Sequence, residues 1–177
     1  AAVGFDLYTE LLEEAIRELE GKPIDADAAR REPEIKSPFP AFLAEEYVPD
    51  VHQRLSLYRR FSASASEAEV DRLEEELRDR FGALPLEAQN LMWVIRLKQL
   101  LKKNGIDVLT VGPEKVSLVS GPGSSLDPVR AISLVSGDPS RYQLTPDSKF
   151  VAKIPTATLR DLYFAMETLF KDLAARR

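Results

Sequence analysis

Apolar residues recur every three or four positions through much of the first half of the chain. This spacing predicts amphipathic helices, each with one buried stripe. The pattern places helices at residues 5–20, 51–62, 66–81 and 86–104. In the helix at 51–62, the stripe expected to be buried consists of Val51, Leu55, Tyr58 and Phe61. The first half is therefore expected to be helical, apart from a proline-flanked edge strand at residues 34–37.

The pattern changes to alternation after residue 105. Residues 106–111 and 115–120 alternate around Gly112–Pro113, which predicts a β-hairpin. A second strand pair is expected around Pro146–Asp147. A short helix at 127–136 should begin with Asp127 as its N-cap, and an amphipathic helix should close the chain.

Helices followed by strands favour an α+β fold over alternating βαβ units. We expect a helical first half packed with a small antiparallel sheet in the second half, and a C-terminal helix. Residues 1–32 are expected to be an N-terminal helix and linker, and residues 33–177 a C-terminal domain. The chain begins without Met, inside an amphipathic pattern, so we expect a fragment of a longer protein.

Composition narrows the possible functions. The chain has no cysteine and one histidine, which excludes disulfides, thiolate zinc sites and a cysteine nucleophile. No phosphate-binding glycine motif is present, and no apolar run is long enough to span a membrane. His52 has no recognisable nucleophile or acid partner, so the sequence gives no reason to expect an enzyme, a metal site or a cofactor in this part of the protein.

The helix at 66–81 is strongly acidic. Glu69, Glu76 and Asp79 line one flank of its apolar stripe. A dense carboxylate surface can dock a basic patch on another domain, because complementary charge sets specificity and register. An ordinary solubilising face is the alternative interpretation of the same residues.

A nucleic-acid grip is another possibility, based on the arginines near Tyr58. Arg54, Arg59 and Arg60 could contact phosphates while the tyrosine stacks on a base. Tyr58 falls on the apolar stripe of its helix, however, so packing also explains it. The formal net charge of −5 counts against non-specific DNA binding.

Several segments resemble the C-terminal domain of bacterial transcription-repair coupling factors (Mfd). The resemblance rests on "VGFDLYTELLEEAI", "FLAEEYVPDVHQRLSLYRRFSAS", "LEEELRDRFGALPLEAQNL" and "LKQLLKKNGID". It covers most of the chain and is strongest over residues 3–20 and 43–105. It implies a longer parent, an ATP-driven DNA translocase that pushes stalled RNA polymerase and recruits nucleotide excision repair. ATP and magnesium would belong to the upstream motor, and RNA polymerase and DNA would bind the parent.

The same resemblance implies a regulatory role without catalysis for residues 33–177, with residues 1–32 as the tail of the translocase module. Such a domain packs on a UvrB-like N-terminal module of the same chain, in competition with UvrA, and keeps the protein repressed. Glu76, and then Glu69 and Asp79, are the residues we expect in this latch. A cytoplasmic, monomeric fragment without membrane contact is also expected.

Overall fold

The computed structural model describes residues 32–174, which form two compact units. Phe39–Arg96 belong to one unit, and residues 32–38 with 97–174 belong to the other. The helix predicted at 5–20 lies outside the described residues. The predicted domain boundary at residue 32 lies at their edge, so both stay predictions. Helix α5 (Leu86–Asn104) contributes residues to both units.

The first unit is helical, as the apolar spacing predicts. Its helices are α3 (Val51–Ala63), α4 (Glu67–Phe81) and the first part of α5. The carboxylate of Asp50 caps α3 by accepting a hydrogen bond from the Gln53 amide at 2.7 Å. Gly82 ends α4 at φ +85°, a conformation that disfavours side chains with a Cβ.

The buried face of α3 differs from the predicted stripe. Val51 is 45% exposed, whereas Leu57 is buried together with Tyr58 and Phe61. At 3.6 residues per turn, these three residues define a face rotated away from Val51. The prediction for Val51 was therefore wrong. The packing interpretation of Tyr58 is confirmed, because its buried hydroxyl accepts a hydrogen bond from the Leu43 amide at 2.7 Å.

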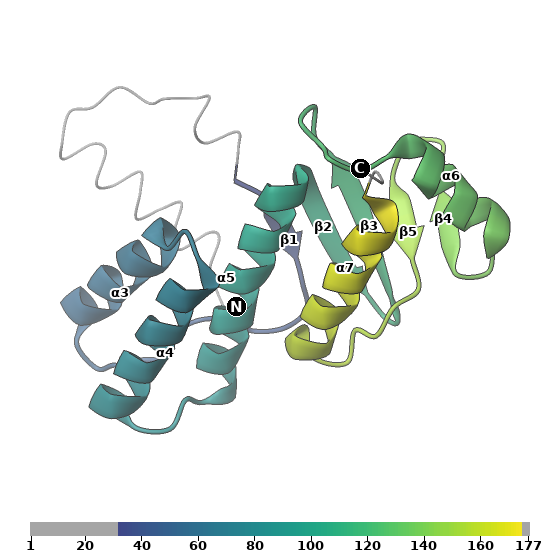
Figure 1. Cartoon of the computed structure of the whole chain (residues 1–177). Helices are drawn as coiled ribbons and strands as arrows, with labels where there is room; N and C mark the ends of the chain where they lie inside the picture. The colour runs from purple at the N-terminus through teal and green to yellow at the C-terminus, as the bar shows by residue number, and fades with distance from the viewer. Residues whose placement is uncertain (1–31, 175–177) are drawn as a thin grey trace. The chain divides into compact units, whose positions relative to one another are not determined.

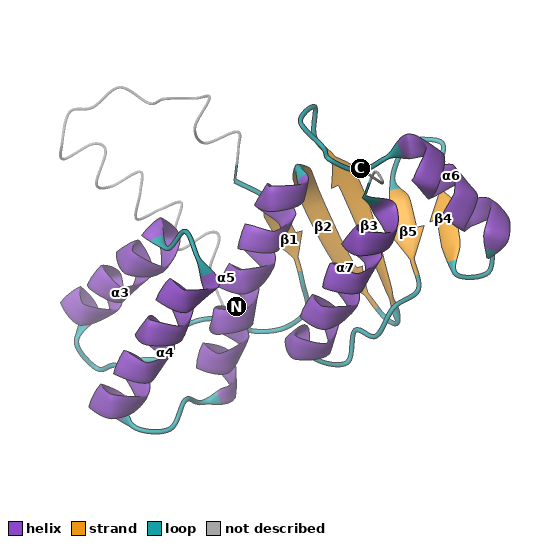
Figure 2. Cartoon of the chain, in the orientation of Figure 1, coloured by secondary structure: helices purple, strands orange, loops and turns teal. Residues whose placement is uncertain are grey.

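The second unit contains a five-stranded, mostly antiparallel sheet (Figure 2). Both predicted strand pairs and the predicted edge strand are present. The edge strand is the one parallel member, since it pairs with β2 in parallel and the other neighbours are antiparallel. In the order in which they lie side by side, the strands are β1 (Glu34–Lys36), β2 (Ile106–Gly112), β3 (Lys115–Ser120), β5 (Phe150–Ala152) and β4 (Tyr142–Leu144).

Helices cover one face of this sheet. Helix α7 (Leu159–Leu173) and the C-terminal part of α5 lie across it (Figure 1). Helix α6 (Pro128–Gly137) contacts β4 and α7 and has no fully buried residue. Its predicted N-cap is confirmed, because Asp127 accepts a hydrogen bond from the Val129 amide at 2.8 Å. The α+β class and the C-terminal helix are confirmed.

Candidate interaction surface on helix α4

Helix α4 lies between α3 and the first part of α5 (Figure 1). Val70, Leu73 and Leu77 are buried on its apolar stripe. The polar residues on either side of this stripe therefore face the neighbouring helices, and a third line of residues points outward. The seven carboxylates of α4 are Glu67, Glu69, Asp71, Glu74, Glu75, Glu76 and Asp79.

Glu76 lies on the flank that faces α3, where two arginines hold it. Its carboxylate accepts hydrogen bonds from Arg60 Nη1 at 2.8 Å and Nη2 at 2.5 Å, and from Arg80 Nη1 at 2.8 Å. The second guanidinium nitrogen of Arg80 donates to Gln53 Oε1 at 3.1 Å. These interactions, the Arg60 hydrogen bonds above all, lower the pKa of Glu76 to about 2. Glu76 thus joins α3 to α4.

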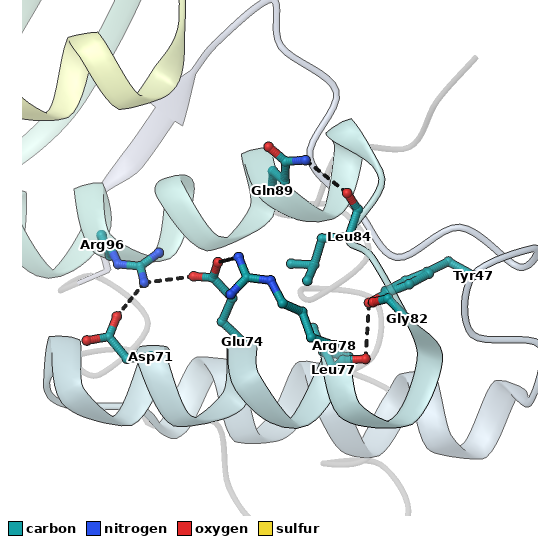
Figure 3. A network of polar contacts seen from close by, with 9 residues as sticks. All are labelled: Tyr47, Asp71, Glu74, Leu77, Arg78, Gly82, Leu84, Gln89 and Arg96. Atoms are coloured by element: carbon teal, nitrogen blue, oxygen red, sulfur yellow. Dashed lines mark hydrogen bonds and ion pairs between the residues drawn. The ribbon is translucent and has the colours of Figure 1, made fainter.

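Arg96 organises the opposite flank. This buried guanidinium of α5 donates to Asp71 at 2.6 Å and to Glu74 at 2.9 Å (Figure 3). Glu74 also accepts a hydrogen bond from Arg78 at 2.6 Å, and the Arg96 guanidinium lies 4.9 Å from the Trp93 ring centroid. Two of the carboxylates on α4 are therefore used to hold α4 and α5 together.

The C-terminal end of α4 is held by a tyrosine hydroxyl. Tyr47 approaches the backbone oxygens of Leu77 at 3.2 Å and Gly82 at 3.0 Å, so its single proton is shared between them (Figure 3). Burial raises the pKa of Tyr47, which keeps this hydroxyl protonated as the donor. The side-chain amide of Gln89 donates to the Leu84 oxygen at 2.9 Å, which holds the turn into α5.

The three residues predicted for the interface have different environments. Glu76 is engaged by arginines, and Glu69 accepts a hydrogen bond at 2.6 Å from the amide of Ala65, the residue before the N-cap Ser66. Asp79 is exposed, and its carboxylate forms no ion pair or hydrogen bond with any residue that the structure describes. The same is true of the Glu75 carboxylate, which stands one helical turn before Asp79 and is not among the residues predicted for the interface.

The arginines proposed for nucleic-acid contact are largely engaged within the chain. Arg54 donates to the backbone oxygens of Val48 at 2.6 Å and Pro49 at 3.0 Å, and Arg60 binds Glu76. Arg59 is exposed. Nucleic-acid binding through these three residues stays a prediction.

Neither a metal site nor a membrane span is found between residues 32 and 174. No three metal-ligating side chains converge in this part of the chain. None of its helices combines the length and the apolar character needed to cross a bilayer. His52 is exposed on α3.

Curated relatives of this chain are transcription-repair-coupling factors. The relative from Myxococcus xanthus is 37% identical over 175 residues, which cover 98% of this chain and 14% of the relative. The relative from Escherichia coli strain K12 is 35% identical over 145 residues, covering 80% of this chain and 12% of the relative. The chain thus spans about one seventh of the length of the Myxococcus relative.

A solved structure shares the fold. It is the crystal structure of the C-terminal domain of a transcription-repair coupling factor, with a TM-score of 0.65 and 17% sequence identity. The match covers 80% of this chain and 94% of that one. The family model of the TRCF domain matches residues 37–131, which is more than half of the 177 residues. The chain therefore belongs to the TRCF domain family, the C-terminal domain of transcription-repair coupling factors.

Proposed function

We propose that this domain is a non-catalytic regulatory part of an ATP-driven DNA translocase that couples stalled transcription to nucleotide excision repair. In this proposal it packs on the UvrB-like N-terminal module of the same protein and masks the surface that UvrA binds. Membership of the TRCF family supports the parent's role in transcription-repair coupling. The outward carboxylates of α4 support the interaction.

The observation that carries the proposal is the division of the α4 carboxylates into engaged and available groups. Asp71, Glu74 and Glu76 hold the three helices together through arginines. Glu75 and Asp79 project from the same rigid helix and make no such contact with a described residue. Carboxylates that folding leaves unpaired suit a basic partner surface. Because the helix backbone is already ordered, binding costs conformational entropy only in the side chains.

This arrangement refines the predicted latch. We propose Asp79 and Glu75 as direct contacts and Glu76 as a partly neutralised neighbour whose orientation Arg60 and Arg80 fix. Glu69 stands on the same flank, at the N-terminal end of α4. The charge reversal Glu76→Arg is a poor test of the latch, because the new arginine would face Arg60 and Arg80 and disturb the contact between α3 and α4.

Asp79→Arg is the sharper test of this latch. Calorimetry should measure the affinity of the chain for the UvrB-like module of the same parent at low and at physiological salt. The affinity of the wild-type chain for the module should decrease as the salt concentration rises. Asp79→Arg should lower this affinity by about tenfold, because it removes a favourable charge contact. In the full-length parent, the same change should increase UvrA binding.

Asp172→Arg is a matched control. It makes the same charge change at another exposed aspartate, on α7, which also has no ion pair with a described residue. It should leave both measurements unchanged. Equal effects of the two variants, or no effect of Asp79→Arg on UvrA binding in the full-length protein, would refute the proposed latch.

A further inference from the structure

The second face of the sheet carries polar and half-buried residues. On the helix-covered face, Ile35, Leu109, Val116, Leu118 and Phe150 are buried. Successive side chains of a strand alternate between faces, so the residues between them point the other way. None of the helices that the structure describes in this unit, α6, α7 and the end of α5, covers that second face (Figure 2). Its central residues are Val108, Thr110, Ser117, Val119, Gln143 and Val151.

Three cationic residues form a row across neighbouring strands, with two lysines on this open face and an arginine at the sheet edge. The pairs Val116↔Ala152 and Ser117↔Val151 set the register of β3 and β5. One step further along the same register, Lys115 lies opposite Lys153. The Lys153 amide donates to the Arg141 backbone oxygen at 2.9 Å, so Arg141, the residue before β4, lies next to Lys153.

The strand register places the backbones of these three residues close together. Adjacent strands are about 4.8 Å apart. Lys115 and Lys153 are both exposed, and their neighbours Val116, Ala152 and Ile154 are buried on the opposite face. The Arg141 guanidinium stands at the sheet edge, 5.1 Å from the Tyr142 ring centroid.

No acidic side chain of the described chain neutralises the two lysines. Other lysines have partners: Lys36 of β1 pairs with Glu34 at 3.5 Å, and Lys149, in the loop before β5, pairs with Asp147 at 2.6 Å. Lys115 and Lys153 form no ion pair with a residue that the structure describes, and this includes the exposed Glu114 beside them.

Folding does not explain this juxtaposition. Like charges directly opposite each other on neighbouring strands destabilise a sheet. The chain as a whole is acidic, with a net charge of −5, so its composition does not explain a local row of cations either. A bound anionic partner would convert this repulsion into attraction.

We infer that the row of Lys115, Lys153 and Arg141 is a docking surface for a carboxylate-rich segment of a protein partner. The residues next to this row favour a protein partner over a nucleic acid. Val151 and the hydroxyl of Ser117 adjoin the row and suit an extended polypeptide. No aromatic residue is among the open-face positions on which a nucleic-acid base could stack. This surface lies in a different unit from α4 and does not depend on the latch proposed above.

Fluorescence anisotropy with a labelled, short poly-L-glutamate peptide tests the inference on the whole chain. Wild-type protein should bind it in a salt-dependent manner. The double variant Lys115→Glu/Lys153→Glu should bind at least about tenfold more weakly. The matched control Lys103→Glu/Lys171→Glu makes the same charge change on α5 and α7, at exposed lysines without an ion pair to a described residue, and should keep wild-type affinity.

The single variant Lys115→Glu separates binding from folding. It replaces a repulsive cross-strand pair by an attractive one, so its thermal midpoint should rise while its affinity for the peptide falls. A surface with only a structural role would give the rise without the loss of binding. Equal loss in the control variant, or the absence of peptide binding by wild-type protein, would overturn the inference. If an oligo(dT) strand binds more tightly than the peptide and needs the same two lysines, the partner is a nucleic acid and not an acidic protein segment.

Discussion

Replacing Glu76 by glutamine should loosen the contact between α3 and α4 without changing its shape. Glutamine keeps the size of the side chain but removes the charge that Arg60 and Arg80 bind. The depressed pKa of Glu76, near 2 instead of 4.5, reports that these arginines favour the ionised carboxylate. At about 1.4 kcal/mol per pKa unit, a shift of this size corresponds to roughly 3.5 kcal/mol in the absence of solvent screening.

The expected loss of stability is smaller than this bound. The Glu76 side chain is 29% exposed and that of Arg60 is 46% exposed, so water screens the interaction. Exposed ion pairs contribute up to about 1 kcal/mol each, and a bidentate arginine lies at the upper end. We therefore expect Glu76→Gln to lower the free energy of unfolding by about 1 kcal/mol at pH 7.

The sign of the pH dependence follows from the depressed pKa. A carboxylate with a lower pKa in the folded state stabilises the fold above the pKa of the unfolded state. This contribution decreases as the pH falls from about 4.5 through about 2. The difference in stability between wild type and Glu76→Gln should therefore narrow over this range and nearly vanish at its lower end.

Urea unfolding followed by Trp93 fluorescence provides the assay. Trp93 is the chain's single tryptophan and lies in the same unit as Glu76. Glu75→Gln is the control, because Glu75 is the exposed neighbour without an ion pair to a described residue. It should change stability by less than about 0.5 kcal/mol. Equal stability of the two variants at pH 7, or an undiminished Glu76→Gln deficit near pH 2, would refute the reasoning.

Two further predictions test other parts of the fold. Arg96→Ala should lower the free energy of unfolding by about 3 kcal/mol, because it removes a buried guanidinium and leaves its two carboxylate partners facing each other. A decrease of less than about 1 kcal/mol in urea unfolding would contradict this prediction. Gly105→Ala should destabilise more than Gly82→Ala, as measured by thermal midpoints. Both glycines have positive φ, but only at Gly105 would the new Cβ meet backbone atoms, at 2.6 Å. An equal decrease in the thermal midpoint of both variants would show that the backbone strain at positive φ alone determines the loss of stability.

Local signals in the sequence were enough to predict most elements. Helix α5 has the predicted bounds, 86–104, because its apolar spacing and the glycine after it are both local. The β2–β3 hairpin likewise follows from alternation on either side of Gly112–Pro113. The parallel pairing of β1 with β2 could not be predicted, since a three-residue strand contains no information about a partner some 70 residues away.

The candidate site was less predictable, for a related reason. The acidic character of α4 and the flank bearing Glu76 were visible in the helical spacing. Its arginine partner on α3 lies 16 residues away, and the partner of Glu74 on α5 lies 22 residues away. Helical spacing reveals neighbours within one helix but not across two. Sequence reasoning therefore ranked Glu76 first for the predicted latch without revealing that this residue also joins α3 to α4.

The ion-paired carboxylates of α4 and the unpaired ones should show different patterns of substitution among relatives. Positions 76 and 60 interact directly, as do positions 74 and 96, so a charge change at one should be accompanied by a compensating change at the other within the same domain. Position 79 has no such internal counterpart in the described chain, and its substitutions should instead track those of residues outside this domain. An alignment of many relatives would then distinguish the carboxylates that build the domain from those that another surface selects.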